Sequence, residues 1–247
     1  MEATANLPAG QTQDKAPHYS KEDERKEALT RAISGQSSSP TFAFPIRLSE
    51  KYRPHRVLEF VGLPKAKRVL AKFVAHPYAC SFLFYGPPGV GKTSMAQAMA
   101  QEMGAEFHHL GSQKCNLDNL EEVCRICQYV PLSGGFHLVL IDEVDSASRA
   151  AQLALLSKLD STDAPMQTVF VFTCNSADNL EPRFLSRCLP IDFSSYGMAG
   201  EIAEFLEKVW HDEGGNGNGP DFARLTKECR NNVRDCLGRL EVELMAL

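Results

Sequence analysis

Residues 86–93 read Gly-Pro-Pro-Gly-Val-Gly-Lys-Thr, and this spacing of glycines, a lysine and a hydroxyl suits the binding of phosphate. The glycines let backbone N–H groups turn toward an anion, and the N-terminus of a following helix adds favourable partial charge. Lys92 is expected to reach the β- and γ-phosphates of a nucleotide, and the Thr93 hydroxyl is expected to hold Mg²⁺. An apolar run at 82–85 and helix-forming residues at 94–100 supply the strand and the helix that flank such a loop. The pattern therefore predicts a P-loop.

Two carboxylates form a second candidate group. Asp142 and Glu143 come directly after the apolar run 138–141. Beside a P-loop, Asp142 is expected to bind Mg²⁺ through its hydration shell, and Glu143 to polarise a water for attack on the γ-phosphate. The alternative is a solvated acidic turn after a strand. The preceding P-loop favours the catalytic interpretation.

Three further polar residues follow later apolar segments or short helices. Asn175 ends the run 169–174, and ligands of open α/β sheets lie at the carboxyl ends of the strands. It is expected to orient the attacking water or sense the γ-phosphate, unless it only caps the next turn. Arg187 could stabilise charge on a transferring phosphoryl group, in cis or in a neighbouring subunit. Taken alone, Arg187 and Arg234 are equally compatible with ordinary surface arginines.

The elements that must position these residues follow from hydrophobic patterning. Apolar strand-like runs alternate with segments of helical period, which predicts βαβ units and a parallel sheet with helices on both faces. The expected strands are Ser81–Tyr85, Ala105–Leu110, His137–Asp142, Thr168–Cys174 and Leu189–Phe193. The expected helices are Thr93–Met103, Leu117–Tyr129, Ala147–Leu159, Pro182–Ser186, Glu201–Trp210, Asp221–Glu228 and Val233–Leu244.

Composition changes twice along the chain and predicts three regions. Residues 1–44 are rich in Gln, Ser, Thr, Pro and charge, so a disordered tail with a short helix over Lys21–Ile33 is expected. Residues 45–195 carry the alternating strands and helices, and residues 196–247 carry helices alone. We therefore expect an α/β nucleotide-binding domain followed by a small all-α domain.

Charge and cysteine usage narrow the class of protein. A formal net charge of −5 argues against a generally basic nucleic-acid coat, so DNA contacts must come from a local patch. Such a patch is offered by residues 46–72, where eight lysines and arginines accompany two glutamates. The eight cysteines form no disulfide-like framework, and neither a signal peptide nor a membrane span is visible. The expectation is a soluble intracellular protein, nuclear in a eukaryote and in the cytoplasm or nucleoid of a prokaryote.

In the order of its motifs, the chain resembles AAA+ ATPases of the clamp-loader type, and specifically small subunits of replication factor C. The resemblance covers about residues 47–247. Its motifs are Lys51-Tyr52-Arg53-Pro54, Phe60-Val61-Gly62, the Walker A loop at 86–93, the Walker B box at 141–146, sensor 1 at Thr173-Cys174-Asn175, Ser186-Arg187-Cys188, and sensor 2 at Val233-Arg234-Asp235. It implies a five-stranded parallel sheet in the order fifth, first, fourth, third, second, with a helical lid.

The resemblance also implies roles for individual residues. Arg187 would act in trans on nucleotide held by the adjacent subunit, while Arg234 would contact nucleotide in cis. The adenine pocket would be lined by Tyr52, Arg53, Val61 and Gly62. The residues expected to bind the phosphates of ATP are Gly86, Pro87, Pro88, Gly89, Val90, Gly91, Lys92, Thr93 and Ser94.

As a function, the resemblance implies an ATPase subunit that loads a sliding clamp on primer–template DNA with other AAA+ subunits, in replication or repair. The alternatives are a stand-alone AAA+ ATPase that remodels another DNA-bound or protein partner, and a binding module that barely hydrolyses ATP. The chain ends at Leu247, where clamp loaders continue into a collar domain. We therefore expect either a piece of a longer protein or assembly through AAA+ contacts alone.

Three weaker signals complete the sequence-based expectations. Cys124 and Cys127 form a C-x-x-C pair, but they fall within an expected helix and have no evident fourth ligand, so buried thiols are favoured over a zinc site. His108 and His109 are neighbours on a strand and point to opposite faces, so they cannot bind one metal together. Arg149 lies where the family tracks DNA phosphates, and a DNA contact there is left open.

Overall fold

The computed structural model describes residues 46–111, 117–132, 134–147, 149–159, 165, 167–178, 180–215, 217 and 219–246. Residues 46–247 form one compact unit. The expected tail and its helix over Lys21–Ile33 lie outside the described residues. The boundary expected at residue 195 between an α/β domain and a helical domain stays a prediction.

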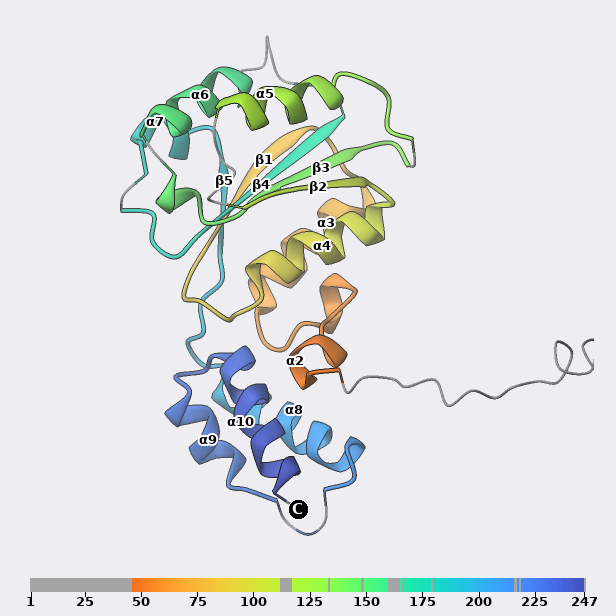
Figure 1. Cartoon of the computed structure of the whole chain (residues 1–247), viewed down its shortest axis with the longest axis vertical. Coiled ribbons are helices and arrows are strands. Elements are labelled where there is room, and N and C mark those ends of the chain that lie inside the picture. The colour runs from red at the N-terminus through yellow and green to blue at the C-terminus, as the bar shows by residue number, and fades with distance from the viewer. Residues whose placement is uncertain are drawn as a thin grey trace, which may run out of the picture. The chain divides into compact units, whose positions relative to one another are not determined.

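The chain alternates strands and helices up to residue 192 and is helical from residue 199 onward, as the patterning predicted (Figure 1). The helices of the first part are α2 (Leu48–Lys51), the 3₁₀ helix η1 (Val57–Glu59), α3 (Pro64–Ala75), α4 (Lys92–Met103), α5 (Leu117–Ile126), the 3₁₀ helix η3 (Val144–Ser146), α6 (Arg149–Leu159) and α7 (Pro182–Leu185). The strands are β1 (Cys80–Tyr85), β2 (Glu106–Leu110), β3 (His137–Ile141), β4 (Thr168–Cys174) and β5 (Leu189–Asp192). The last helices are α8 (Ala199–Asp212), α9 (Phe222–Glu228) and α10 (Val233–Met245).

The five strands form one parallel sheet in the order β2-β3-β4-β1-β5. This is the order that the family resemblance implied, so the predicted fold class is confirmed. Because all strands run the same way, their carboxyl ends meet at one edge of the sheet. The chain enters loops at that edge after Tyr85, Leu110, Ile141 and Cys174, and the candidate site residues follow these strands.

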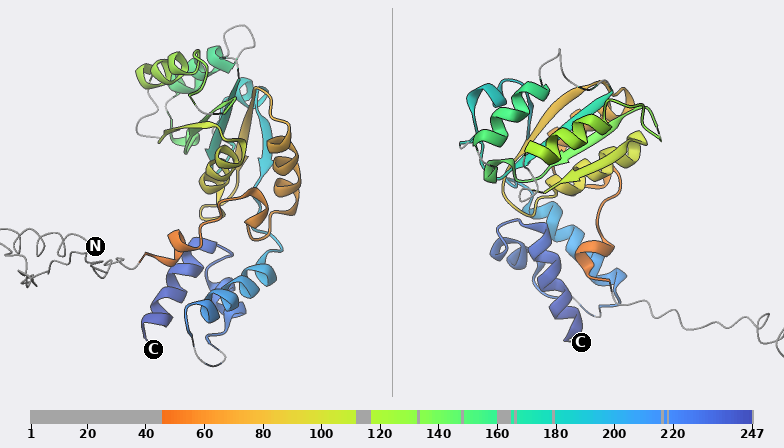
Figure 2. Two further views of the ribbon diagram at one scale, coloured as in Figure 1. Left: turned by 90° about the vertical axis from the view of Figure 1, so that its right-hand side faces the viewer. Right: turned by 45° about the horizontal axis from the view of Figure 1, so that its top comes forward.

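Helices cover both faces of the sheet, and the strands are accordingly apolar on both sides (Figure 2, left). Phe82, Phe84 and Val171 face the core shared with α3 and α4. The alternate residues Leu83 and Phe172 face the core shared with α5, α6 and α7. Strand residues therefore alternate between two cores, which fixes the orientation of every strand.

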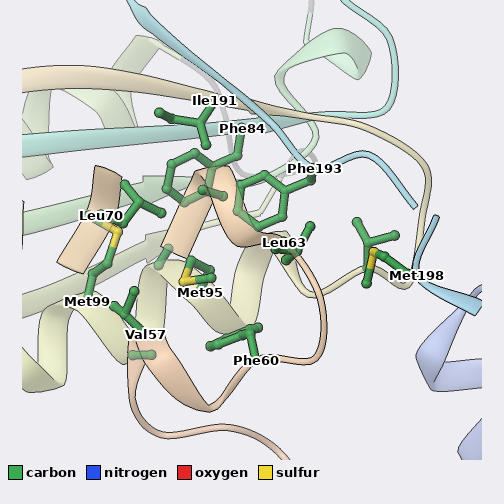
Figure 3. Close-up of a cluster of buried hydrophobic side chains, with 14 of the residues drawn as sticks. Val57, Phe60, Leu63, Leu70, Phe84, Met95, Met99, Ile191, Phe193 and Met198 are labelled. Carbon is green, nitrogen blue, oxygen red and sulfur yellow. The ribbon is translucent and has the colours of Figure 1, made fainter. Parts of the chain in front are cut away.

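The first core extends from the sheet to the last helices. Figure 3 shows Phe84 and Phe193 side by side, with ring centroids 4.8 Å apart, above Leu63 and Met95. Met198 lies close to this group and belongs to the same buried cluster as Leu206, Trp210 and Leu240 of the last helices, so those helices share a continuous apolar core with the sheet. Among the described residues, no helix is both long and apolar enough to cross a membrane.

Several helix boundaries differ from the expectation by one to three residues. Helix α5 ends at Ile126, three residues before the expected Tyr129, so Cys127 follows the helix instead of lying inside it. Helix α6 begins at Arg149, two residues after the expected Ala147, and residues 144–146 form the separate 3₁₀ helix η3. These differences lie at helix ends, where pattern alone is least informative.

Candidate nucleotide site

The glycine loop lies between β1 and α4, and its lysine is almost buried. Lys92 is the first residue of α4 and is 9% exposed. Its ammonium donates hydrogen bonds to the carbonyls of Gly86 (2.6 Å) and Pro87 (2.9 Å) and to Asn175 Oδ1 (3.1 Å). Burial lowers the pKa of Lys92, while nearby negative groups, Asp142 among them, oppose the shift. The loop thus holds a desolvated cation beside the N-terminus of a helix, which favours an anion there.

Asp142, the first residue after β3, forms the acidic side of the same site. Thr93 Oγ1 lies 3.1 Å from both carboxylate oxygens of Asp142. The Thr173 hydroxyl of β4 also donates to this carboxylate. His109, at the end of β2, brings its Nε2 to 3.7 Å from Asp142 Oδ2. The two predicted metal ligands, Thr93 and Asp142, are therefore in direct contact. Residues at the ends of β4 and β2 also contact the Asp142 carboxylate.

Glu143 and Asn175 are held in defined positions by neighbouring strand ends. Glu143 adopts a left-handed backbone conformation (φ 53°), and its N–H donates to Thr173 Oγ1 at 3.0 Å. The Asn175 side chain accepts from Lys92, and its N–H donates to Asp145 Oδ2 at 3.1 Å. Asp145 Oδ1 is buried and has no hydrogen-bond partner among the described residues. Both predicted catalytic residues therefore border the site of Lys92.

Two pockets adjoin these residues, and Arg234 lines both. The small pocket, of about 130 Å³, is lined by Pro88, Gly89, Gly91, Lys92, Thr93, Ser94, Asp142, Glu143, Thr173, Cys174, Asn175 and Arg234. The large pocket, of about 450 Å³, is lined by residues of the 49–61 segment, the glycine loop, α8 and α10. Arg234, the second residue of α10, thus connects the acidic and cationic groups to a more apolar space.

Three of the four residues expected at an adenine ring line the large pocket: Tyr52, Arg53 and Val61. Gly62 does not line it, and its N–H instead donates to Glu201 Oε2 at 3.0 Å. Tyr52 packs edge-to-face against Phe205 of α8, and its hydroxyl donates to Glu213 Oε1 at 2.6 Å. Burial, followed by the contact with Glu213, raises the pKa of Tyr52. The tyrosine therefore joins the segment before the sheet to the last helices.

Sequence reasoning assigned no role to Asn232, which contacts the glycine loop. Its side chain caps α10 by accepting from the Asp235 N–H at 3.2 Å. A Cβ atom added at Gly89 would overlap Asn232 Oδ1. An asparagine before a helical run is a recognisable capping signal, but its contact with residue 89 depends on long-range packing that spacing does not encode.

Arg187 lies away from these groups. It is exposed, and it is absent from the residues that line either pocket in the described part of the chain. Its guanidinium donates to the Arg183 carbonyl at 3.0 Å, while the neighbouring Cys188 is buried in the core beside α7. The structure therefore does not bring Arg187 to the site of its own chain.

The family profile described as "ATPase family associated with various cellular activities (AAA)" matches residues 82–195. Replication factor C small subunit 1 of Pyrobaculum arsenaticum is 31% identical over 173 residues, which cover 67% of this chain and 52% of the relative. Replication factor C subunit 3 of Saccharomyces cerevisiae is 33% identical over 154 residues, covering 58% of this chain and 44% of the relative. The chain thus spans about half the length of these curated relatives.

Among solved structures, the Thermotoga maritima RuvB Holliday junction branch migration motor has a TM-score of 0.64 at 19% identity. The match covers 76% of this chain and 64% of that chain. At this level of identity the likeness concerns the fold alone.

The order of the parallel strands, the glycine loop and the profile match together define the AAA+ class of P-loop fold. Within that class, the chain is similar to replication factor C small subunits, as the order of its motifs predicted.

The contact between Gly89 and Asn232 gives a stability prediction. Gly89→Ala is expected to lower the free energy of unfolding by about 2–4 kcal/mol, because it combines a positive φ (77°) with an overlap at Asn232. Gly104→Ala is the matched control: its φ is also positive (61°), but nothing lies within 4 Å of an added Cβ. Gly104→Ala should lower the free energy of unfolding by only about 1–2 kcal/mol. Urea unfolding monitored by circular dichroism measures both.

Adding Asn232→Gly to Gly89→Ala should recover part of the loss, because glycine is itself a tolerated N-cap. Equal destabilisation by Gly89→Ala and Gly104→Ala would contradict the contact.

Proposed function

We propose that this chain binds ATP with Mg²⁺, hydrolyses it, and serves as an AAA+ subunit of a clamp-loader-like complex that loads a sliding clamp on primed DNA. The observation that carries the proposal is the meeting of Lys92, the Thr93–Asp142 pair, Glu143 and Asn175 at one edge of the sheet. These groups are the parts that phosphoryl transfer requires: a cation, oxygen ligands, and polar groups that position water.

The residues fit a nucleotide and its metal. Hydroxyl and carboxylate oxygens are the ligands that Mg²⁺ prefers, and Thr93 and Asp142 offer both. The unpartnered buried oxygen of Asp145 adds negative potential nearby. Bound Mg²⁺ would neutralise charge on the phosphates. The large pocket combines Tyr52, Val61 and Phe205 with residues of the glycine loop, a lining suited to the flat faces of an aromatic ring such as adenine.

Each residue would then have a separate task. Lys92, held by two carbonyls and Asn175, would exchange these acceptors for phosphate oxygens. Glu143, exposed in the small pocket, would accept the proton of an attacking water, and Asn175 would orient that water. Arg234 would contact the phosphates from α10, which links them to the helices around the large pocket.

The clamp-loader assignment is supported by the named relatives and by the position of Arg187. An exposed arginine that lines neither pocket of its own chain is suited to reach the nucleotide of a neighbouring subunit. The partners that this assignment implies are other AAA+ subunits, the sliding clamp and primer–template DNA.

DNA contacts would use a restricted set of basic residues. Arg47, Lys51, Arg53 and Arg56 all pair with carboxylates of this chain. Arg149, at the start of α6, pairs with Glu181 at 2.6 Å. Because an exposed ion pair contributes only about 0–1 kcal/mol, a DNA phosphate could replace Glu181 at little cost. The other exposed pairs are equally replaceable, and Arg149 is our candidate phosphate contact because it lies where the resembled family tracks DNA phosphates.

Binding and turnover can be separated with two variants. Lys92→Ala is expected to weaken binding of a fluorescent ATP analogue about 10–100-fold, because charge-assisted hydrogen bonds to phosphate are lost. Glu143→Gln should bind the analogue normally and release phosphate about 10²–10⁴-fold more slowly. Glu207→Gln, on the exposed side of α8, is the matched control. Normal binding by Lys92→Ala, or normal turnover by Glu143→Gln, would remove the residue from its proposed role.

The trans role of Arg187 predicts that activity depends on assembly. Hydrolysis per chain should rise with protein concentration, and Arg187→Ala should bind ATP but lose about 10³-fold in the assembled rate. Arg183→Ala, at an exposed arginine within α7, is the control. Mixing Arg187→Ala with Lys92→Ala should restore hydrolysis, because one chain supplies the pocket and the other supplies the arginine. Concentration-independent hydrolysis that survives Arg187→Ala would exclude the trans role.

The clamp-loader function itself predicts a dual response. Phosphate release by the chain, with its partner AAA+ subunits where they are required, should be stimulated more by primed DNA and a sliding clamp together than by the sum of the two separately. The control is unprimed single-stranded DNA with the same clamp. A response to neither component, with normal basal hydrolysis, would favour a stand-alone AAA+ ATPase that acts on another partner.

A further inference from the structure

A second group of metal-ligating side chains lies at the edge of the sheet opposite the glycine loop. Glu106 and His108 are alternate residues of β2, so they share one face, and the register pairs Glu106 with His137, the first residue of β3. Cys127 follows the last residue of α5, the helix that covers this face, and its N–H bonds to the Val123 carbonyl at 3.0 Å. Two strands and one helix end therefore bring a thiol, two imidazoles and a carboxylate together.

The distances within this group suit a small tetrahedral ion. His108 Nε2 lies 3.1 Å from His137 Nδ1, and the ligand atoms of His108, Cys127 and His137 all lie within 4.8 Å of one another. Zn–N bonds of about 2.0–2.1 Å and a Zn–S bond of about 2.3 Å give N···N and N···S separations of about 3.3–3.6 Å in a tetrahedral site. The two imidazole nitrogens are thus already close to the separation that a zinc ion requires, and the Cys127 sulfur must move by about 1 Å to reach its own.

The orientation of His137 is fixed by a hydrogen bond outside the group. His137 is 1% exposed, and its Nε2 lies 2.9 Å from the Tyr129 carbonyl, to which only a protonated nitrogen can donate. The proton therefore belongs on Nε2, and the lone pair of Nδ1 points at His108 and Cys127. A carbonyl that orients a ligating histidine through its other nitrogen is the usual arrangement at protein metal sites.

Glu106 brings a carboxylate close to both imidazoles. Its Oε1 lies 4.0 Å from His108 Nε2, and its Oε2 lies 3.9 Å from His137 Nδ1. The Leu132 N–H donates to Oε2 at 3.0 Å and holds the carboxylate in this orientation. Glu106 lies outside the set of ligand atoms that are all within 4.8 Å of one another, so it must turn away from the Leu132 N–H to supply a fourth ligand, the number found in closed structural sites.

We propose that His108, Cys127, His137 and Glu106 bind one Zn²⁺ ion that fastens the end of α5 to β2 and β3. A thiolate with two imidazoles selects zinc over magnesium or calcium, which prefer oxygen ligands alone. On binding, the Cys127 S–H bond breaks, the proton passes to solvent, and the sulfur bonds to the metal. Because the site lies at the amino ends of β2 and β3, about 16 Å along the strands from Asp142, its role is structural.

The test measures metal content and binding on the full chain, purified without metal-affinity resin. We expect about one zinc per chain by mass spectrometry. After zinc removal, Co²⁺ titration should produce tetrahedral d–d bands and a thiolate-to-cobalt charge-transfer band. Cys127→Ser should lose the charge-transfer band, and His137→Gln and Glu106→Gln should weaken zinc affinity about tenfold or more. Cys124→Ser, a buried cysteine one helical turn earlier, is the matched control and should keep the band.

A stability measurement keeps the proposal testable if Cys127→Ser fails to fold. Zinc at about a hundredfold excess over its Kd should raise the Tm of the metal-free wild-type chain by about 5–10 °C. The proposal is overturned if the wild-type chain carries no zinc and shows no thiolate-to-cobalt band. It is equally overturned if Cys124→Ser loses the band while Cys127→Ser keeps it.

Discussion

The candidate nucleotide site is organised around the burial of one ammonium group. Placing Lys92 at 9% exposure removes its water, and that cost is met by two loop carbonyls and Asn175 Oδ1. Asn175 is itself held by Asp145, which extends the arrangement to η3. The glycine loop, the end of β4 and the turn after β3 therefore depend on the same cation, and none of them can move independently of it.

Much of this arrangement is local enough to be predicted from sequence. The strand cores, the glycine loop and the acidic turn after β3 are predicted to within a residue or two, because each is specified by a run of apolar residues with polar residues at its end. The strand order was implied by resemblance alone, and the sheet confirms it. Helix α3 is missing from the helices that patterning predicted, although Pro64 at its first turn and buried residues Ala66, Leu70 and Phe73 at helical spacing were available signals.

What could not be predicted depends on register and long-range packing. His137 faces Glu106 only because β2 and β3 pair at one particular offset, and sequence spacing does not encode that offset. Sequence reasoning treated Cys124 and Cys127 alike as buried thiols, whereas the end of α5 sets Cys127 alone against two histidines. The expectation that His108 and His109 face opposite sides is confirmed, since one lies near His137 and the other near Asp142. Similarly, Asn232 meets Gly89 through the docking of α10, and Gly62 turns toward Glu201 instead of the large pocket.

Arg234 and Asn232 occupy the first turn of α10, and both are in contact with the surroundings of the glycine loop. The same helix contacts α2 through Glu241 and the Leu48 N–H, some two turns away. Helix α10 therefore has one end at the glycine loop and its later turns at α2. Because a helix is stiff, a displacement at either end is transmitted to the other. By thermodynamic reciprocity, if a partner bound at the far end of α10 changes the affinity of the candidate nucleotide site by some factor, a nucleotide bound there changes the affinity for that partner by the same factor.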